Sequence, residues 1–592
     1  MTYRAPLAEQ MFVLETIGDV DRLAELTGFE HVDADIAAAV LDETRKLAED
    51  ELYAVSRIGD EQGSTWKDGD VRLPDGFAAA YAKWVEGGWN GIEAPEAYGG
   101  QNLPLTVSAI IQEQMFAANV GLSQIMSLTA GAVRAIEAHG SDALKATYLP
   151  KMVSGEWSGT MNLTEPGAGS DVGALRTIAE PADDGSYRIR GAKIYITFGE
   201  HDATKNIIHL VLARIVGAGE GTRGISLFLV PKFLPDADGQ PGKRNDVRCT
   251  GIEHKLGMRG SATASLSYGD DGECVGYLVG EPQGGIRAMF TMMNHARIGV
   301  GIQGVGVADI AYQKAARYAQ ERVQSAPLEG ERTPVRIIDH PDVRRNLMMM
   351  RALVEASRSL EVYNSLQIDC GHAAAGDEAR AASARAELLT PCTKAFCTDI
   401  SLEVSSLAIQ VFGGIGFIEE TGIAQHYRDA RILPIYEGTN GIQALDLVRR
   451  KLRLENGETW RALLDEIDAD AARWRLEPAL AAGAAVLVEA SATLRTITDR
   501  LLEMRITDAA SGATPYLRMF SLVTCGWLMG RQAAAAADRL STADGDPDFL
   551  SAKIATAAFF QQQVLTEVFA LQHLVLAGVT PLFAIPDAQF PA

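Results

Sequence analysis

The chain has 592 residues, of which 47% are apolar and 22% charged, a composition that excludes intrinsic disorder and a membrane-embedded protein and allows several packed units. Its 54 basic and 77 acidic residues give a formal charge of −23, which disfavours nucleic-acid and anionic-lipid partners. The six cysteines form no CxxC pair, so neither a disulfide framework nor a metal site is expected.

The first third of the chain is predicted to be helical. Its start mixes acids among apolar residues and lacks the layout of a signal peptide, which favours a bacterial-type cytoplasm or an organelle matrix as location. From residue 34 to about 158, apolar residues recur at spacings of three and four. This pattern indicates an N-terminal α-helical domain over 1–158.

The pattern then changes to that of β-strands. Residues 186–198, 206–215 and 224–233 alternate or run apolar, with Gly and Asp turns between them, and predict a middle β domain over 159–283. Long helical patterns return over 284–453. The polar break "LENGET" offers a turn with Thr459 as a candidate helix N-cap, and an alanine-rich helical block fills 459–592. The predicted fold is therefore mainly α with a central β domain and an additional C-terminal helical domain.

One stretch approaches the length of a membrane span. Val568 to Ile585 is apolar but contains Gln572, His573 and Pro581, so a buried terminal helix is expected there and no membrane span.

Three glycine-rich stretches are candidates for ligand contact or close packing. "LTEPGAGSD" (Leu163 to Asp171) offers backbone N–H groups and hydroxyls to a flat or anionic ligand, or is merely a turn. "RIGVGIQGVG" (Arg297 to Gly306) lies inside a helical pattern with no preceding strand, so its small residues favour close helix packing. "FGGIGF" (Phe412 to Phe417) opens an irregular joint, where an approach to phosphate is possible.

Glu437 is the strongest candidate for a catalytic residue. It follows the apolar run 432–436 and precedes Gly438, and a carboxylate in apolar surroundings has a raised pKa and is a better base for carbon acids. The alternative is an exposed acid near a helix start, where it complements the helix dipole. The chain has no GxSxG, HExxH or Walker motif, so hydrolase and metal chemistry have little support.

Five motifs in order resemble those of the acyl-CoA dehydrogenase family: "LTEPGAGSD", "KIYITFG", "EHKLGMRGSATASL", "QVFGGIGF" and "IYEGTNGIQ". The resemblance runs from about residue 35 to 452. "YRAPL", "LLTPCTKAFCTD" and the added C-terminal block further resemble a longer bacterial branch that includes 3-methylmercaptopropionyl-CoA dehydrogenases.

The resemblance implies FAD as cofactor, with these flavin-contacting residues: Met161, Leu163, Thr164, Gly169, Ser170, Tyr195, Ile196, Thr197, Arg322, Gln410, Phe412, Gly413, Gly414, Thr439 and Asn440. It implies that the substrate is bound by Ser170, Asn294, Arg297 and Gly438. Tyr195 departs from the family's tryptophan and Asn294 from its acid. Arg322 matches an arginine that grips the flavin of a neighbouring subunit, although "SAPLEG" replaces the residues that usually follow it. Some relatives place the base just before Arg297, where this chain has Ala296, so the base implied is Glu437.

The implied reaction is α,β-dehydrogenation of an acyl-CoA thioester to the trans-2-enoyl-CoA. Glu437 takes the α-proton while a hydride passes to flavin N5, and the substrate is 3-methylmercaptopropionyl-CoA or another short or medium acyl-CoA. The expected partners are an electron-transfer flavoprotein or similar acceptor and, because the C-terminal block takes the place of a second subunit pair, a second copy in a homodimer.

Three alternatives remain open from the sequence. An acyl-CoA oxidase uses the same residues and would release hydrogen peroxide under air. A DNA-alkylation-response flavoprotein has this fold and a basic C-terminal region, whereas the last block here alternates in sign. An inactive assembly scaffold would have no need of Glu437.

Overall fold

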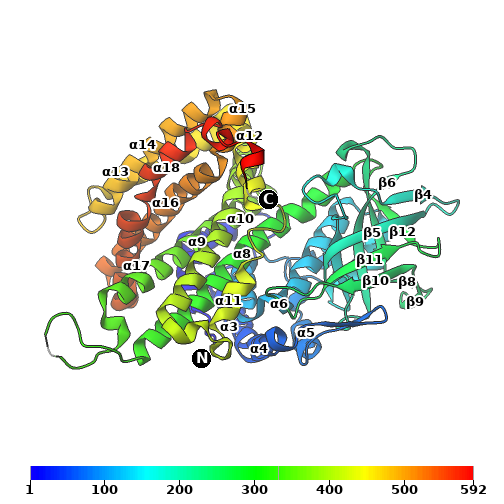
Figure 1. Ribbon diagram of the computed structural model, residues 1–592, viewed down its shortest axis with the longest axis horizontal. Coiled ribbons are helices and arrows are strands. Elements are labelled where there is room, and N and C mark those ends of the chain that lie inside the picture. Colours follow the sequence, from blue (N-terminus) through cyan, green and yellow to red (C-terminus); the bar gives the residue numbers. More distant parts are fainter. Residues whose placement is uncertain (1, 331, 591–592) are drawn as a thin grey trace.

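The computed structural model describes residues 2–330 and 332–590. Helices form one large body and strands form a compact unit beside it (Figure 1). The N-terminal helices are α1 (Leu7–Thr16), α2 (Val20–Leu23), α3 (Ala34–Leu47), α4 (Tyr53–Gln62), α5 (Phe77–Glu86), α6 (Leu105–His139) and α7 (Asp142–Val153). A hairpin of three-residue strands, β1 (Thr65–Lys67) and β2 (Asp70–Arg72), interrupts them; it was not predicted, because its residues are largely exposed and carry no alternating pattern.

The middle unit is a β domain. Its strands are β3 (Trp157–Asn162), β4 (Ile178–Pro181), β5 (Tyr187–Thr197), β6 (Asn206–Ile215), β7 (Ile225–Pro231), β8 (Phe233–Pro235), β9 (Pro241–Arg244), β10 (Val247–Ile252), β11 (Thr263–Tyr268) and β12 (Val275–Val279). The main sheet has the order β10-β11-β5-β12-β7-β6-β3, and β4 pairs with both β5 and β6. Because β5 and β6 lie apart along that path, β4 folds the sheet back on itself, as a barrel-like domain requires.

Long helices return after the β domain. They are α8 (Gly285–Glu321), α9 (Pro341–Ala373), α10 (Gly376–Phe412), α11 (Ile423–Ala430) and α12 (Asn440–Arg449). Two helical stretches, Leu105–His139 and Gly376–Phe417, are long and apolar enough to cross a membrane by length and composition alone. Both belong to the bundle in which α6 and α10 pack against α8 and α9.

The glycines of α8 allow this bundle to pack closely, as the sequence predicts. A Cβ added at Gly304 would lie 2.5 Å from the carbonyl oxygen of Cys397 in α10, and one at Gly306 would lie 2.7 Å from the backbone nitrogen of Ala117 in α6. Neither backbone could move away without separating two helices. Small residues are therefore required on both sides of α8.

Replacing Gly304 with Ala is expected to lower the free energy of unfolding by about 1–3 kcal/mol, because the added methyl group overpacks the contact with α10. Urea denaturation followed by circular dichroism measures the change. The matched control is Gly219→Ala, where a Cβ meets no atom within 4 Å. Equal stabilities of the two variants would contradict the packing role of Gly304.

The last block is a separate layer of helices that packs on the main body (Figure 1). It contains α13 (Glu458–Trp474), α14 (Ala481–Glu503), α15 (Ile506–Ser511), α16 (Ala513–Thr542), α17 (Pro547–Phe559) and α18 (Glu567–Val575). Helix α16 contacts α9, α10 and α12. The predicted N-cap is wrong: α13 begins at Glu458, after Gly457, whose φ of +87° makes the turn that Thr459 would otherwise have to make.

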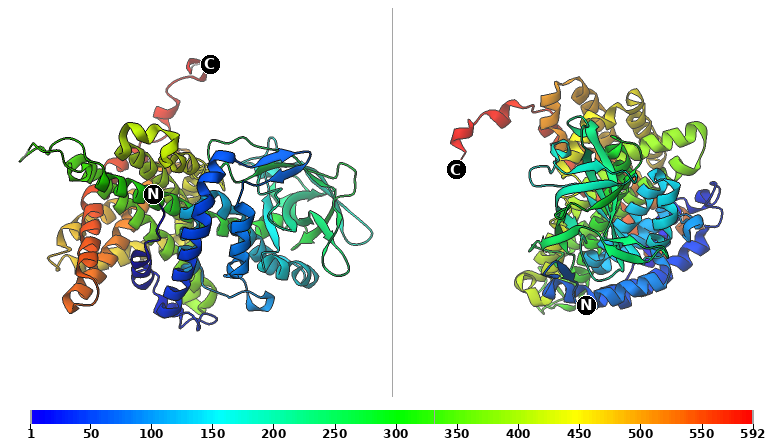
Figure 2. Two further views of the ribbon diagram at one scale, coloured as in Figure 1. Left: turned by 90° about the horizontal axis from the view of Figure 1, so that it is seen from below. Right: turned by 90° about the vertical axis from the view of Figure 1, so that its right-hand side faces the viewer.

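The C-terminal stretch is not one buried helix. Val568, Leu571 and Val575 of α18 are buried as expected, but the helix ends there, and Leu582 and Phe583 are exposed. Gly578, at φ +71°, and Pro581 cannot continue a helix at this point. The segment that follows α18, up to residue 590, projects from the body (Figure 2).

Candidate active site

Glu437 lies in a strained turn between α11 and α12. Its φ is +56° and that of Gly438 is +84°, so two consecutive residues have left-handed backbone. Glycine adopts this conformation freely, but a glutamate there costs about 1–3 kcal/mol and persists only where the surroundings hold it. The side chain is half-buried, which agrees with the catalytic interpretation and not with an acid on an open surface.

Burial raises the pKa of Glu437 to about 6, and the charges of Arg297 in α8 and Lys394 in α10 act in the opposite direction. Arg297 itself has a buried Nε without a hydrogen-bond partner among the described residues, and its guanidinium lies 5.6 Å from the centre of the Phe290 ring. The turn therefore holds a carboxylate that is poised near neutral pH, beside an arginine with an unused donor.

The residue before Glu437, Tyr436, is hydrogen-bonded to polar side chains of two other helices. The Tyr436 hydroxyl donates to Gln303 of α8 and accepts a hydrogen bond of 3.3 Å from Gln124 of α6. Tyr436 also packs in the apolar cluster that includes Met258 of the β domain. Three separate parts of the chain thus meet beside the candidate base.

Thr439 and Asn440, both predicted to contact the flavin, also hold the local structure. Thr439 caps α12, because its hydroxyl accepts from the backbone N–H of Ile442 at 3.3 Å. The Asn440 amide donates to Ala395, Thr398 and Asp399 of α10 at 2.8–3.1 Å. The side chain of Asn440 thus points at α10, and its contact with the flavin stays a prediction.

The loop predicted to line the flavin is fixed to the neighbouring strand β5. The buried Lys193 of β5 donates to the Leu163 carbonyl at 3.0 Å and pairs with Glu165 at 2.7 Å. The backbone N–H of Ile194 donates to the Thr164 carbonyl at 3.0 Å. Sequence reasoning gave Lys193 and Glu165 no role; a lysine inside an alternating strand pattern was the available signal.

The exposed faces of this region fit a flat group. Tyr195 is 60% exposed and has a φ of +60°, whereas Ile196 is buried and Thr197 half-buried. Gly169 and Ser170 are exposed, and a Cβ added at Gly169 would meet nothing within 4 Å. An uncovered aromatic ring next to an open glycine loop leaves room for the planar ring system of a flavin.

Helix α8 joins this loop to the Glu437 turn. Met161 and Leu163 pack against the cluster that contains Met289 and Met292 of α8, and Arg297 follows little more than one turn later. Asn294, predicted to contact the substrate, is exposed on the same turn. The structure therefore brings the loop 161–170, Asn294, Arg297 and Glu437 to one region.

The remaining predicted residues form a second cluster. Arg322 ends α8, and the Phe412 ring of α10 stacks on Tyr318 of α8 with centres 4.3 Å apart, which places 410–414 beside Arg322. At about 1.5 Å per residue, Arg322 lies about 37 Å along α8 from Arg297. Gln410 lies about 24 Å along α10 from Lys394. Gln410, Gly413 and Gly414 are exposed. One chain does not bring the two clusters together.

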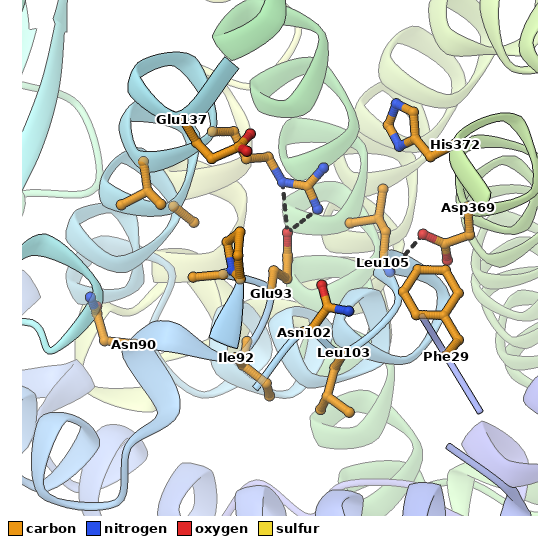
Figure 3. Close-up of a pocket in the computed structure, with 15 residues that line it drawn as sticks. Phe29, Asn90, Ile92, Glu93, Asn102, Leu103, Leu105, Glu137, Asp369 and His372 are labelled. Carbon is orange, nitrogen blue, oxygen red and sulfur yellow. Dashed lines mark hydrogen bonds and ion pairs between the residues drawn. The ribbon is translucent and has the colours of Figure 1, made fainter. Parts of the chain in front are cut away.

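A cavity of about 210 Å³ lies between α6, α9 and the loop before α6 (Figure 3). Two of its acids are hydrogen-bonded: Glu93 accepts from Arg134 at 2.7 Å, and Asp369 accepts from the Leu105 N–H at 2.9 Å. None of the predicted site residues is among the described residues that line it.

Models of one family match almost the whole length of the chain. They are described as the acyl-CoA dehydrogenase N-terminal domain (residues 36–156), middle domain (160–270) and C-terminal domain (283–452), and as an acetyl-CoA dehydrogenase C-terminal-like domain (463–586). The chain belongs to the acyl-CoA dehydrogenase family. It is an acyl-CoA dehydrogenase, and the family's cofactor, FAD, is its cofactor.

Full-length relatives support this assignment. The chain is 45% identical to the 3-methylmercaptopropionyl-CoA dehydrogenase of Ruegeria pomeroyi, over 96% of this chain and 97% of that protein. It is 36% identical to a butyryl-CoA dehydrogenase of Syntrophomonas wolfei, over 99% of both. An acyl-CoA dehydrogenase of Bacillus anthracis, solved with FAD, has the same fold, with a TM-score of 0.75, 22% identity and coverage of 94% of this chain and 90% of that one.

Proposed function

We propose that the enzyme dehydrogenates a short or medium acyl-CoA thioester to the trans-2-enoyl-CoA, with Glu437 as the base. The observation that carries this proposal is the half-buried Glu437 carboxylate, held in a left-handed turn beside Arg297 and Lys394. Strained backbone of this kind clusters at active sites, and here it coincides with a carboxylate of raised pKa.

Different residues of the chain are proposed to bind the proton, the substrate and the cofactor. The Glu437 carboxylate takes the α-proton. The backbone N–H of Glu437 stabilises the negative charge that develops on the thioester oxygen. The unpartnered Nε of Arg297 is available to the CoA moiety. Bound FAD supplies the acceptor for the β-hydride, at N5. The loop 161–170 and Tyr195 are the residues that would hold the flavin against this region.

We propose 3-methylmercaptopropionyl-CoA as the substrate, or another acyl-CoA of similar length. The identity of 45% to a dehydrogenase of that ester supports this choice.

We propose that the active form is a homodimer, in which the cluster of Arg322 and 410–414 serves the flavin of the partner copy. The distance of about 37 Å along α8 supports this, because the cluster is out of reach of its own Arg297. Ile415, Phe417 and Ile418 beside it are exposed, with Phe417 at 87%, which fits a face covered by a second subunit.

The electrons are proposed to pass to an electron-transfer flavoprotein or a similar carrier. The proposed location is the cytoplasm, in keeping with six cysteines that are all buried and unpaired.

The purified enzyme with an artificial electron acceptor is expected to turn over 3-methylmercaptopropionyl-CoA and butyryl-CoA with kcat/KM at least about tenfold above that for aryl and long-chain esters, because each misfitting group costs about 1–3 kcal/mol. A panel of short, branched, thioether, aryl and long acyl-CoA esters measures this preference. Equal or higher kcat/KM on long-chain esters would contradict the substrate proposal, and no turnover on any ester would contradict the function.

A further inference from the structure

Lys394 of α10 is a buried lysine that touches the Glu437 turn at several points. Its Nζ donates to the carbonyl oxygen of Leu433, the carbonyl oxygen of Gly438 and Oδ1 of Asn440, each at 2.9 Å. An ammonium group has three N–H donors, and here all three are used. The side chain is 0% exposed, so no water replaces these contacts.

The three acceptors bracket the catalytic residue. Leu433 lies before Glu437 in the turn, and Gly438 and Asn440 lie after it. Within the turn, the Asn440 N–H donates to the Pro434 carbonyl at 2.9 Å, and Gln443 donates to the Glu437 carbonyl at 3.2 Å. Lys394 is the group that ties both ends of this turn to a neighbouring helix.

Helix α10 gives Lys394 a rigid base. The preceding residue, Thr393, lies where Gly301 of α8 allows close approach, and it accepts a hydrogen bond of 3.0 Å from Asn364 of α9. One turn later, Thr398 accepts from Asn440 at 3.0 Å. The lysine therefore projects from a closely packed part of the bundle.

The positive charge of Lys394 acts on the carboxylate of Glu437. The charged groups that act on it are Glu437 in the turn, Asp399 on its own helix and Arg297 on α8. Neither carboxylate is hydrogen-bonded to Nζ, so the positive charge stays available to both.

We infer that Lys394 is a positioning residue for the dehydrogenation: its ammonium clamps the two ends of the Glu437 turn and its charge favours the ionised carboxylate. This inference rests on the proposed function, because it assigns Lys394 a role only if Glu437 is the base.

The pKa of Lys394 gives the clamp a pH limit. Burial lowers it to about 7, while Glu437 and Asp399 raise it and Arg297 lowers it further. As pH rises through this value, the ammonium loses a proton, and a neutral amine has only two donors for three acceptors. Glu437, in contrast, needs a pH above its own pKa of about 6 to accept a proton. The two groups together predict a maximum of kcat at near-neutral pH.

The test is Lys394→Met in the full-length holoenzyme, assayed with the best ester of the panel. FAD content and flavin absorbance are expected to stay at the wild-type level and KM to change by less than about threefold. A misplaced base costs about 10²-fold in kcat. The acid limb, the rise of kcat with pH as Glu437 ionises, is expected to move to a pH roughly one unit higher, because the cation that favours the ionised carboxylate is gone. The alkaline limb, the fall of kcat as Lys394 loses its proton, is expected to disappear because methionine does not titrate.

Two further variants complete the test. Lys394→Arg keeps the charge and is expected to keep the acid limb at the wild-type pH even where kcat falls. Lys314→Met is the control. Lys314 is a buried lysine on a different helix, α8, where its Nζ lies over the Tyr53 ring, and its loss is expected to leave the whole pH profile of kcat unchanged.

The inference is overturned if Lys394→Met retains wild-type kcat, or if kcat falls with both limbs unmoved. If Lys394→Met does not yield holoenzyme, Lys394→Gln replaces it in the same assays, because glutamine keeps two N–H donors but carries no charge. Failure of the proposed function is distinguishable, because the wild-type enzyme would then turn over no acyl-CoA.

Discussion

Replacing Glu437 with Gln lowers kcat by about 10²- to 10⁴-fold, the usual contribution of a general base, while FAD remains bound. Glutamine keeps the shape of the side chain and its contact with the turn but cannot accept the α-proton. The wild-type kcat is expected to rise with pH through about 6, because the pKa of Glu437 is raised to that value and the protonated form below it is inactive. Steady-state assays of both proteins across pH measure the two effects.

Glu420→Gln is the matched control for Glu437→Gln. Glu420 is an exposed acid on the same segment, before α11, and its loss is expected to leave kcat and its pH profile unchanged. Activity of the Glu437 variant within a factor of three of wild type would mean that another group takes the proton.

Replacing Arg358 with Met lowers the free energy of unfolding by about 3–5 kcal/mol, the cost of leaving buried charges without their partner. Arg358 of α9 is 1% exposed and pairs with Glu113 of α6 at 2.6 Å and Asp309 of α8 at 3.3 Å. Glu9 of α1 lies 3.8 Å away. One guanidinium thus joins four helices, and methionine fills its volume without its charge.

Urea denaturation, followed by circular dichroism and by flavin fluorescence, measures the loss. Arg345→Met is the control, since among residues 2–330 and 332–590 Arg345 pairs only with Asp342, one turn earlier in α9 and at the surface, where such pairs contribute less than about 1 kcal/mol. If both arginine variants were destabilised equally, the buried network would not be what holds α6, α8 and α9 together.

The order of helical and β segments could be predicted because each has a long, regular hydrophobic period. The β1–β2 hairpin could not, since its strands are three residues long and mostly exposed. The chain after Val575 was expected to be buried because Leu582 and Phe583 are apolar, but hydropathy does not show whether a partner surface exists.

The candidate base was predictable, because Glu437 interrupts an apolar run and sits in a recognisable motif. Lys394 and Arg358 were not assigned any role. Their partners lie far away in sequence, at Gly438 for Lys394 and at Glu113 for Arg358, and periodicity does not pair residues across such distances. A lysine or arginine inside a long predicted helix was the available signal for both.

In the proposed reaction Glu437 takes the α-proton in the chemical step. Anaerobic rapid mixing of the holoenzyme with its acyl-CoA substrate tests it most directly, because flavin reduction is then observed without any electron acceptor. With Glu437 as the base, the flavin absorbance of the wild-type enzyme is expected to bleach rapidly. In Glu437→Gln the spectrum is expected to shift on substrate binding, and bleaching is expected to be slowed at least about 10²-fold. Bleaching of the variant at the wild-type rate would mean that Glu437 is not the base.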